Sequence, residues 1–260
     1  MKFRHQLLAA LLAGLSLSHA GQARAAATTE VSYATLMGST VNFNELVTTP
    51  YDSLVIDGLL TSGGVQFGER FAGQELAVAK QPRPGAVAQD WFDDLSFGLP
   101  TAGLAVLAGV VGGNLGAYHY GDADGAALFG MGPQAGNTDG FGSISARLAA
   151  PVAALGLQLR DDDGGAVLLN LYRTDGSLIQ AVDLSGRSDG RYAFARSGGT
   201  ADIAGFSLTN RDSYYGVSID NLRLGSVAEV NAVPEPGSIA LTLAGFAAMG
   251  VVARRRRRPG

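Results

Sequence analysis

Carboxylates are the side chains in this sequence with the greatest capacity for chemistry. The chain has 23 Asp and Glu residues, but only three His and no Cys. Zinc and iron sites need clustered His or Cys, so these metals are set aside. Calcium takes about six to eight oxygen ligands from carboxylates and backbone carbonyls. The composition therefore favours calcium as a candidate structural cofactor.

Two acidic clusters offer such oxygen ligands. Asp122, Asp124 and Gly125 form an Asp-x-Asp-Gly segment that lacks the later glutamate of an EF-hand. Asp161 to Asp163 lie at the expected tip of a hairpin, where the like charges repel unless they are solvated or bridged by a cation. Solvation is the simpler explanation for this second cluster.

Asp220 is the strongest single candidate for a metal ligand. It interrupts the apolar strand sequence VSIDNLRL, and a carboxylate that turns inward from such a strand needs a partner. Strand alternation places Val217, Ile219 and Asn221 on one face. The same alternation predicts that Asp220 shares the other, buried face with Leu222 and Leu224.

Nucleophilic catalysis requires a base beside the nucleophile, usually a histidine. His119 is the single histidine beyond the N-terminal leader. Residues 186–190 match G-x-S-x-G, but that motif works on a turn from strand to helix, whereas here it joins two apparent strands. We therefore predict a turn role for Ser188 and a surface position for His119, with ligand contact as the alternative for His119, and assign no catalytic residue.

Glycoside hydrolysis requires only two suitably spaced carboxylates, one of which acts as an acid with a raised pKa. Asp93 and Asp94 follow Trp91 and Phe92, and this is the one local hint of an acid in aromatic surroundings. The preferred interpretation is that the two aromatic side chains cover the core while both aspartates face water.

The second half of the chain predicts an antiparallel β-sandwich. Short apolar runs recur at roughly ten-residue spacing from Ile144 onward, and turn sequences such as Asp175-Gly176 separate them. In the run from Ala166 to Arg173, both alternating faces carry apolar residues, which predicts a strand covered on both sides.

The first half is less regular. Strands are expected over residues 40–43, 53–56 and 65–67, and a loop over 81–85. Residues 104–111 form either a buried strand or a short helix, since an apolar run alone does not distinguish them. The Gly-rich stretch 112–142 is expected to be a long surface excursion.

The N-terminus has the pattern of a secretory signal peptide over residues 1–26, with Lys2 and Arg4 before an apolar run. Three of the 19 basic residues lie in this leader and five in the C-terminal tail, whereas only Glu235 of the 23 acidic residues lies in either. The exported part therefore carries a charge of about -11, which repels nucleic acid and anionic lipid.

The C-terminal tail has three signals in a fixed order: Pro234-Glu235-Pro236, an uncharged apolar run over 239–253, and Arg254, Arg255, Arg256, Arg257 and Arg258. The run is at the short limit for a membrane helix, and the arginines hold its end in the cytoplasm. This tail resembles that of the PEP-CTERM family of bacterial proteins. The resemblance implies recognition by an exosortase and cleavage at the Pro-Glu-Pro element.

The central region resembles the jelly-roll, carbohydrate-binding-like ectodomains that often precede such tails. The matching segments include Val41-x-Phe43 and the late Ile219-Asp220-Asn221-Leu222. Similarity to calcium-stabilised jelly rolls implies that Glu45 and Asp220 meet across the first and last strands and hold a structural calcium ion.

Three regions follow: a signal peptide (1–26), a β-sandwich ectodomain (27–232) and a sorting tail (233–260). We expect a non-enzymatic surface or matrix protein that the Sec translocon exports, that the C-terminal helix holds briefly in the inner membrane, and that an exosortase processes. Its expected partner is extracellular polysaccharide or another biofilm component, with glycan binding by the ectodomain. The alternatives are a secreted polysaccharide hydrolase and a purely structural envelope protein.

Overall fold

The computed structural model describes residues 27–80, 91–132, 139–160, 166–211 and 216–228. These residues form β-strands joined by turns, with two short 3₁₀ turns at Tyr33–Thr35 (η1) and Ser197–Gly199 (η2). The predicted all-β, antiparallel class is confirmed. The expected signal helix and C-terminal membrane helix lie outside the described residues. Within the described ranges, no helix is long and apolar enough to cross a membrane.

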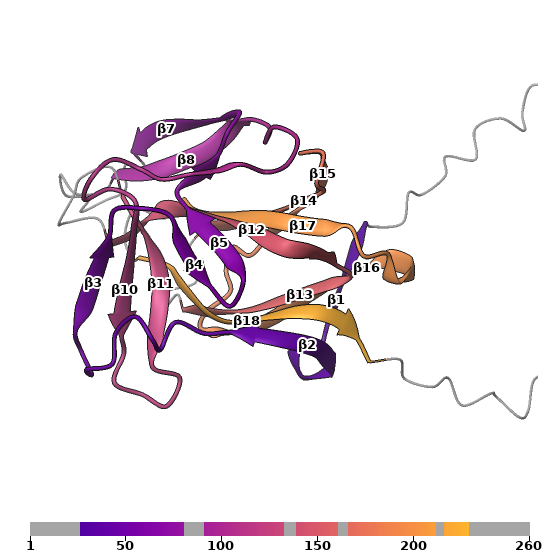
Figure 1. Ribbon diagram of the computed structural model, residues 1–260, viewed down its shortest axis with the longest axis horizontal. Helices are drawn as coiled ribbons and strands as arrows, with labels where there is room; N and C mark the ends of the chain where they lie inside the picture. Colours follow the sequence, from indigo (N-terminus) through magenta and orange to yellow (C-terminus); the bar gives the residue numbers. More distant parts are fainter. Residues whose placement is uncertain (1–26, 81–90, 133–138, 161–165, 212–215, 229–260) are drawn as a thin grey trace, which may run out of the picture. The chain divides into compact units, whose positions relative to one another are not determined.

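Fourteen strands of the described chain join in one sheet. The sheet has two halves, which are connected where β11 pairs with β12. One half continues through β18, β13, β16 and β1, with β2, β10 and β3 attached, and the other through β17, β14 and β15, with β5 and β4 attached. Figure 1 shows the halves facing each other. The strand bounds are β1 Thr28–Val31, β2 Leu36–Val41, β3 Ser53–Ile56, β4 Leu60–Ser62, β5 Val65–Gly68, β6 Arg70–Phe71, β7 Gln74–Lys80, β8 Trp91–Gly98, β9 Val106–Leu107, β10 Leu115–His119, β11 Ala126–Met131, β12 Asp139–Val152, β13 Ala154–Arg160, β14 Val167–Tyr172, β15 Leu178–Asp183, β16 Gly190–Arg196, β17 Ile203–Asn210 and β18 Ser218–Val227.

One apolar core fills the space between the two halves. Leu157 on β13 and Phe194 on β16 enter it from one half, and Leu169 on β14 and Phe206 on β17 from the other. Full burial of each such side chain contributes roughly 1.5–3 kcal/mol. A core of this extent stabilises the fold of a chain that has no cysteine for disulfides.

A second, smaller apolar cluster lies on the outer side of β14 and β17. Its members are Phe71, Leu104, Val106, Tyr172 and Ala204. Leu169 and Leu171 face the main core, whereas Tyr172 points into this second cluster. The prediction that this strand is covered on both sides is therefore confirmed.

The strands predicted at 53–56 and 65–67 occur as β3 and β5, whereas β2 ends at Val41 and so overlaps only the first half of the strand predicted at 40–43. Residues 104–111 contain only the two-residue strand β9, and Leu107, Val110 and Val111 are exposed, so neither a buried strand nor a helix spans this range. The prediction for residues 112–142 was wrong, because β10, β11 and the start of β12 lie in this segment. Four of its glycines, Gly116, Gly130, Gly140 and Gly142, are strand residues, and a Cβ at Gly130 would come within 2.4 Å of the Gly142 backbone.

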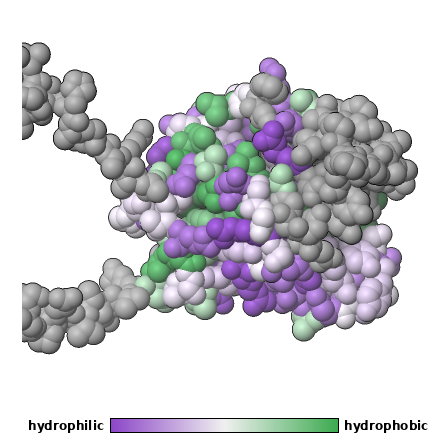
Figure 2. Space-filling model, turned by 180° about the vertical axis from the view of Figure 1, so that it is seen from behind, coloured by the Kyte–Doolittle hydropathy of each residue, from purple (hydrophilic) through white to green (hydrophobic). Residues whose placement is uncertain are grey.

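The surface of this unit has a mixed character. On the face seen in Figure 2, hydrophobic residues form small groups that hydrophilic residues separate. Large exposed apolar side chains occur on and near β3 and in the 107–111 segment, including Val55, Val110 and Val111.

Candidate functional site

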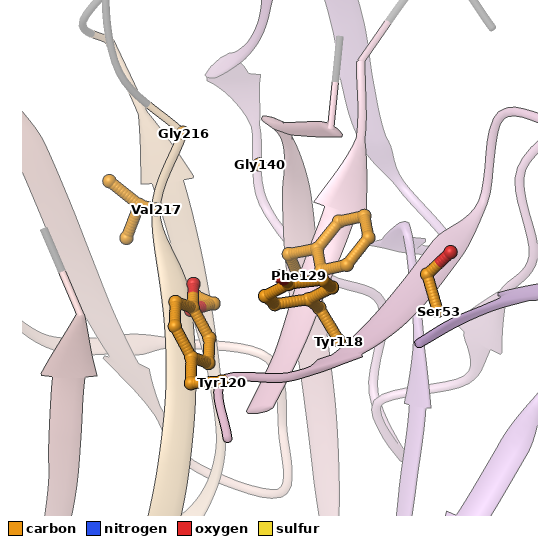
Figure 3. A pocket seen from close by; sticks show the side chains of 8 residues that line it. Ser53, Tyr118, Tyr120, Phe129, Gly140, Gly216 and Val217 are labelled. Carbon is orange, nitrogen blue, oxygen red and sulfur yellow. The ribbon is translucent and has the colours of Figure 1, made fainter. Parts of the chain in front are cut away.

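An open pocket of about 350 Å³ lies on the outer face of β3, β10, β11 and β18. Ser53, Tyr118, Tyr120, Phe129, Gly140, Gly216, Val217 and Ser218 line it. In Figure 3, Tyr120 and Val217 lie on one side of the pocket and Ser53 on the other, with Tyr118 and Phe129 between them. None of these lining residues is charged, so the pocket suits a neutral ligand.

Strand alternation explains why aromatic side chains gather here. Leu115 and Ala117 on β10 point into the core, so the intervening Gly116 and the following Tyr118 face outward. Tyr118 pairs with Ser53 on β3, and Gly116 pairs with Phe129 on β11. All four positions therefore lie on the outer face of neighbouring strands.

Gly116 makes room for the Phe129 ring. A Cβ at position 116 would come within 2.3 Å of that ring, a distance that atoms in contact do not adopt. Phe129 in turn pairs with Ser218 on β18. The floor of the pocket therefore depends on a glycine in the middle of a strand, where a side chain is usually found.

Tyr120 is held in place from several sides. Its ring meets that of Tyr118 edge-on, with centroids 5.0 Å apart, and its hydroxyl lies 2.9 Å from the Ser218 Oγ. The Arg160 guanidinium lies 4.5 Å from the ring centroid, within the range of a cation–π contact. These contacts fix the orientation of Tyr120 at the edge of the pocket.

Arg160 is itself buried and paired. It donates two hydrogen bonds to the Asp122 carboxylate, at 2.8 and 3.2 Å, and lies 3.8 Å from Asp124. The hydrogen bond from Arg160 holds the pKa of Asp122 below its usual range. The acids of the Asp-x-Asp-Gly segment therefore pair with an arginine in this structure.

Asp124 extends this arrangement into a polar network beside the pocket. Its carboxylate accepts hydrogen bonds from Arg191 at 2.7 Å and from Gln158 at 3.0 Å. Asn221 donates to Gln158 at 2.9 Å and to Asp220 at 3.0 Å. The network joins β13, β16, β18 and the β10–β11 turn.

Asp220 belongs to this network. It is buried as expected, but the prediction that it shares a face with Leu222 and Leu224 was wrong. Gly156 pairs with Arg223 and Gln158 pairs with Asp220, so two residues of β18 stand opposite Leu157. This is a β-bulge, and Asn221 adopts the left-handed φ of 46° within it.

The bulge shifts the alternation of side chains along β18. Ile219, Leu222 and Leu224 all face the core, and Asp220 faces the opposite side. The Asp220 carboxylate is nevertheless fully buried, and it accepts a hydrogen bond from the Asn221 backbone amide at 2.6 Å. Burial raises the pKa of Asp220 to about 6.

The carboxylates of Glu45 and Asp220 bind to different groups. Glu45 lies exposed after β2, and its Oε1 accepts a hydrogen bond from the Ser62 Oγ at 2.5 Å. Asp220 accepts hydrogen bonds from Asn221. Among the residues that the structure describes, no three His, Asp or Glu side chains gather as a metal site would require. A calcium ion at this pair stays a prediction.

Asp93 is buried rather than facing water, so the preferred interpretation was wrong for this residue. Its exposed fraction is 1%, and burial with the nearby Glu69 carboxylate raises the pKa of Asp93 to about 8. Asp94 lies 3.7 Å from Arg211 in an ion pair. The side chains of Trp91 and Phe92 lie outside the described part. Asp93 has the raised pKa of an acid catalyst, but at this exposure it does not reach a substrate.

The remaining candidates have local structural roles. The His119 Nδ1 accepts a hydrogen bond from the Gly121 amide at 2.9 Å. Ser188 lies between β15 and β16, and its carbonyl accepts from the Tyr192 hydroxyl at 2.8 Å. The prediction of a turn serine is confirmed. Asp161 to Asp163 lie outside the described residues.

The tail matches a known sorting signal. Residues 232–258 match the PEP-CTERM protein-sorting motif. Comparison of the chain with curated proteins and with solved structures gives no significant match. The match covers Pro234 to Pro236 and Arg254 to Arg258, all outside the described residues, and it confirms the resemblance of the tail. The chain therefore carries a signal for exosortase sorting, which implies export and passage through the membrane before processing.

Proposed function

We propose that this protein is a non-enzymatic component of the cell surface or extracellular matrix that binds a neutral glycan in the pocket formed by Tyr118, Tyr120 and Phe129. The sorting motif supports export and the exosortase as a partner. The observation that carries the binding role is the open pocket of about 350 Å³ with aromatic, hydroxyl and backbone groups and no charge in its lining.

This lining matches the chemistry of a sugar. A sugar ring presents C–H groups, which pack on aromatic side chains, and hydroxyl groups, which need hydrogen-bond partners. Ser53 and Ser218 supply hydroxyls on two sides of the pocket. Ligand pockets usually measure about 300–1,000 Å³, so this one has room for a small saccharide. The charge of about -11 on the exported part disfavours acidic polysaccharides.

The route to the matrix completes the proposal. The Sec translocon exports the chain, the C-terminal apolar run inserts transiently in the inner membrane, and the exosortase cuts at Pro234-Glu235-Pro236. The antiparallel β-sheet ectodomain then associates with extracellular polysaccharide of the biofilm. A structural calcium ion at Glu45 and Asp220 is part of this proposal.

Binding of neutral oligosaccharides to the purified protein tests the proposal, with NMR titration or calorimetry as the readout. Tyr118→Ala should weaken binding about tenfold, which is about 1.4 kcal/mol. Tyr120→Ala should weaken it similarly.

Tyr192→Ala is a matched control for the second variant, because Arg187 lies 4.9 Å from the Tyr192 ring much as Arg160 lies over Tyr120. Equal affinities in wild type, Tyr118→Ala and Tyr120→Ala would contradict the assignment of the pocket. Release of reducing sugar from the oligosaccharides would instead favour the hydrolase alternative.

A further inference from the structure

Two buried acids lie where the β7–β8 hairpin meets the main sheet. Asp93 on β8 is 1% exposed, and Glu69, between β5 and β6, is 4% exposed. Ser143 on β12 contacts both residues: its backbone amide donates to Asp93, and its Oγ donates to the Glu69 carbonyl at 2.8 Å. Asp93 and the main chain of Glu69 therefore both contact Ser143, and the Glu69 charge is near enough to act on Asp93.

The positive charge of Arg70 neutralises only one of the two acids. Arg70 forms an ion pair with the Glu69 carboxylate. The Asp93 Oδ1 is buried and has no hydrogen-bond partner among the described residues. A buried carboxylate without a counter-charge is costly, and such a group retains a proton instead.

The other ionisable groups near β8 do not change this balance. Arg211 lies beside Asp94 rather than Asp93. Glu75 on β7 and Arg147 on β12 are exposed, and β17 has no ionisable side chain along Ile203–Asn210. The local charge is therefore set by Glu69, Arg70 and Asp93.

We propose that Asp93 retains its proton at neutral pH beside the Glu69–Arg70 ion pair, and that loss of this proton loosens the β7–β8 hairpin from the main sheet. The hairpin is a separate two-stranded sheet that packs on β12 and β17 through β8. A second negative charge in this interface repels Glu69 and lacks solvation, so the hairpin moves outward to hydrate it. The fold thus contains an alkaline-sensitive contact, independent of glycan binding.

The direction of the pH dependence follows from linkage. The folded protein binds the proton up to about pH 8, whereas an unfolded aspartate loses it near its ordinary pKa of 3.8. Stability from this group is therefore fully present at low pH and declines as the pH rises to about 8. One proton corresponds to a tenfold rise in the unfolding constant per pH unit, or about a hundredfold between pH 5 and pH 7.

Two measurements on the purified protein test the proposal. Infrared spectroscopy at pH 7 should show the carbonyl band of a protonated carboxyl group, and this band should be strongly reduced in Asp93→Asn. Trp91 is the sole tryptophan of the chain and belongs to β8, so its fluorescence reports on the hairpin. Its emission should titrate near pH 8 in the wild type, and the hundredfold rise in the unfolding constant should be missing in Asp93→Asn. Asp183→Asn, at an exposed aspartate on β15, is the matched control and should behave as the wild type does.

Glu69→Gln provides a second test should Asp93→Asn fail to fold. It removes the neighbouring negative charge, so the titration of Trp91 emission should move to lower pH. A wild-type protein without the carboxyl band at pH 7 overturns the proposal, and so does an unchanged titration midpoint in Glu69→Gln.

Discussion

Replacement of Asp220 by asparagine should destabilise the protein in acid and stabilise it at neutral pH. The Asp220 carboxylate is fully buried, and its pKa is raised from 3.8 to about 6. A raised pKa means that stability is present below the unfolded value and is lost as the pH rises to the folded value. The difference of about two pKa units corresponds to a loss of about 3 kcal/mol between roughly pH 4 and pH 6.

Asparagine does not titrate, so this pH-dependent loss of stability disappears in the variant. The substitution also removes one hydrogen bond. In the variant, an amide nitrogen would face the Asn221 Nδ2, which donates to the Asp220 Oδ2 at 3.0 Å in the wild type. This change costs about 1 kcal/mol. We therefore expect Asp220→Asn to be about 1 kcal/mol less stable than the wild type below about pH 4 and about 2 kcal/mol more stable above pH 6.

Urea denaturation of both proteins from pH 4 to pH 8 gives the difference in unfolding free energy, and other titrating groups cancel in that difference. Asp175→Asn is the control. A hydrogen bond from Ser177 lowers the pKa of Asp175, so the difference in unfolding free energy should change with pH in the opposite direction. A variant that is destabilised by the same amount at every pH would refute the reasoning, since it would show that Asp220 does not change protonation differently in the folded state.

Four other predictions concern the pocket, its arginine, the tail and calcium binding. Gly116→Ala should displace the Phe129 ring, which a Cβ would approach to 2.3 Å, and lower glycan affinity at least tenfold, or about 1.4 kcal/mol, by calorimetry; unchanged affinity would contradict the pocket geometry. Asp122→Asn should cost about 1 kcal/mol in urea denaturation at pH 7, because it weakens the pairing of the buried Arg160. Since the pKa of Asp122 is lowered, this cost should vanish in strong acid, and a cost that persists there would point to a packing effect. Glu235→Ala should leave the tail uncut in the exporting cell, as mass measurement of the protein would show, and normal processing would exclude a role for that residue. Calcium should raise the melting temperature relative to EDTA if the ion binds the folded protein, and equal melting curves would remove calcium from the proposal.

Local sequence patterns were sufficient to predict most strands of the second half. The segment Ala154–Arg160 alternates clearly, and Asp175-Gly176 supplies a turn in which Gly176 has the positive φ of 84°. Both features depend on neighbours in the sequence, so a single chain reveals them.

The pocket and the buried face of β18 depend on partners far away in the sequence. From composition alone, Gly116 suggests a loop. The Phe129 ring fills the space that a side chain at position 116 would need, and this becomes evident only once β10 and β11 pair. The bulge at Asn221 likewise depends on register with β13. An Asn at the centre of an apolar strand was the one available signal, since Asn tolerates the left-handed region.

Burial of Asp93 also required tertiary information. Alternation along β8 places Asp93 and Asp94 on opposite faces, so at most one aspartate of the pair faces water. The sequence could indicate this opposition, but not that the hairpin lies over β12 with Asp93 inward. Ser143 and Glu69, which lie close to it, are distant in the chain.

The walls of the pocket come from both ends of the ectodomain: Ser53 lies on β3 and Ser218 begins β18. Contacts between segments so far apart form late and slowly when a chain folds. A ligand of this pocket would therefore bind only to chains whose last strand has docked. Extracellular glycan would then act as a selective stabiliser of completely folded molecules after export, and binding itself would serve as an assay for complete folding.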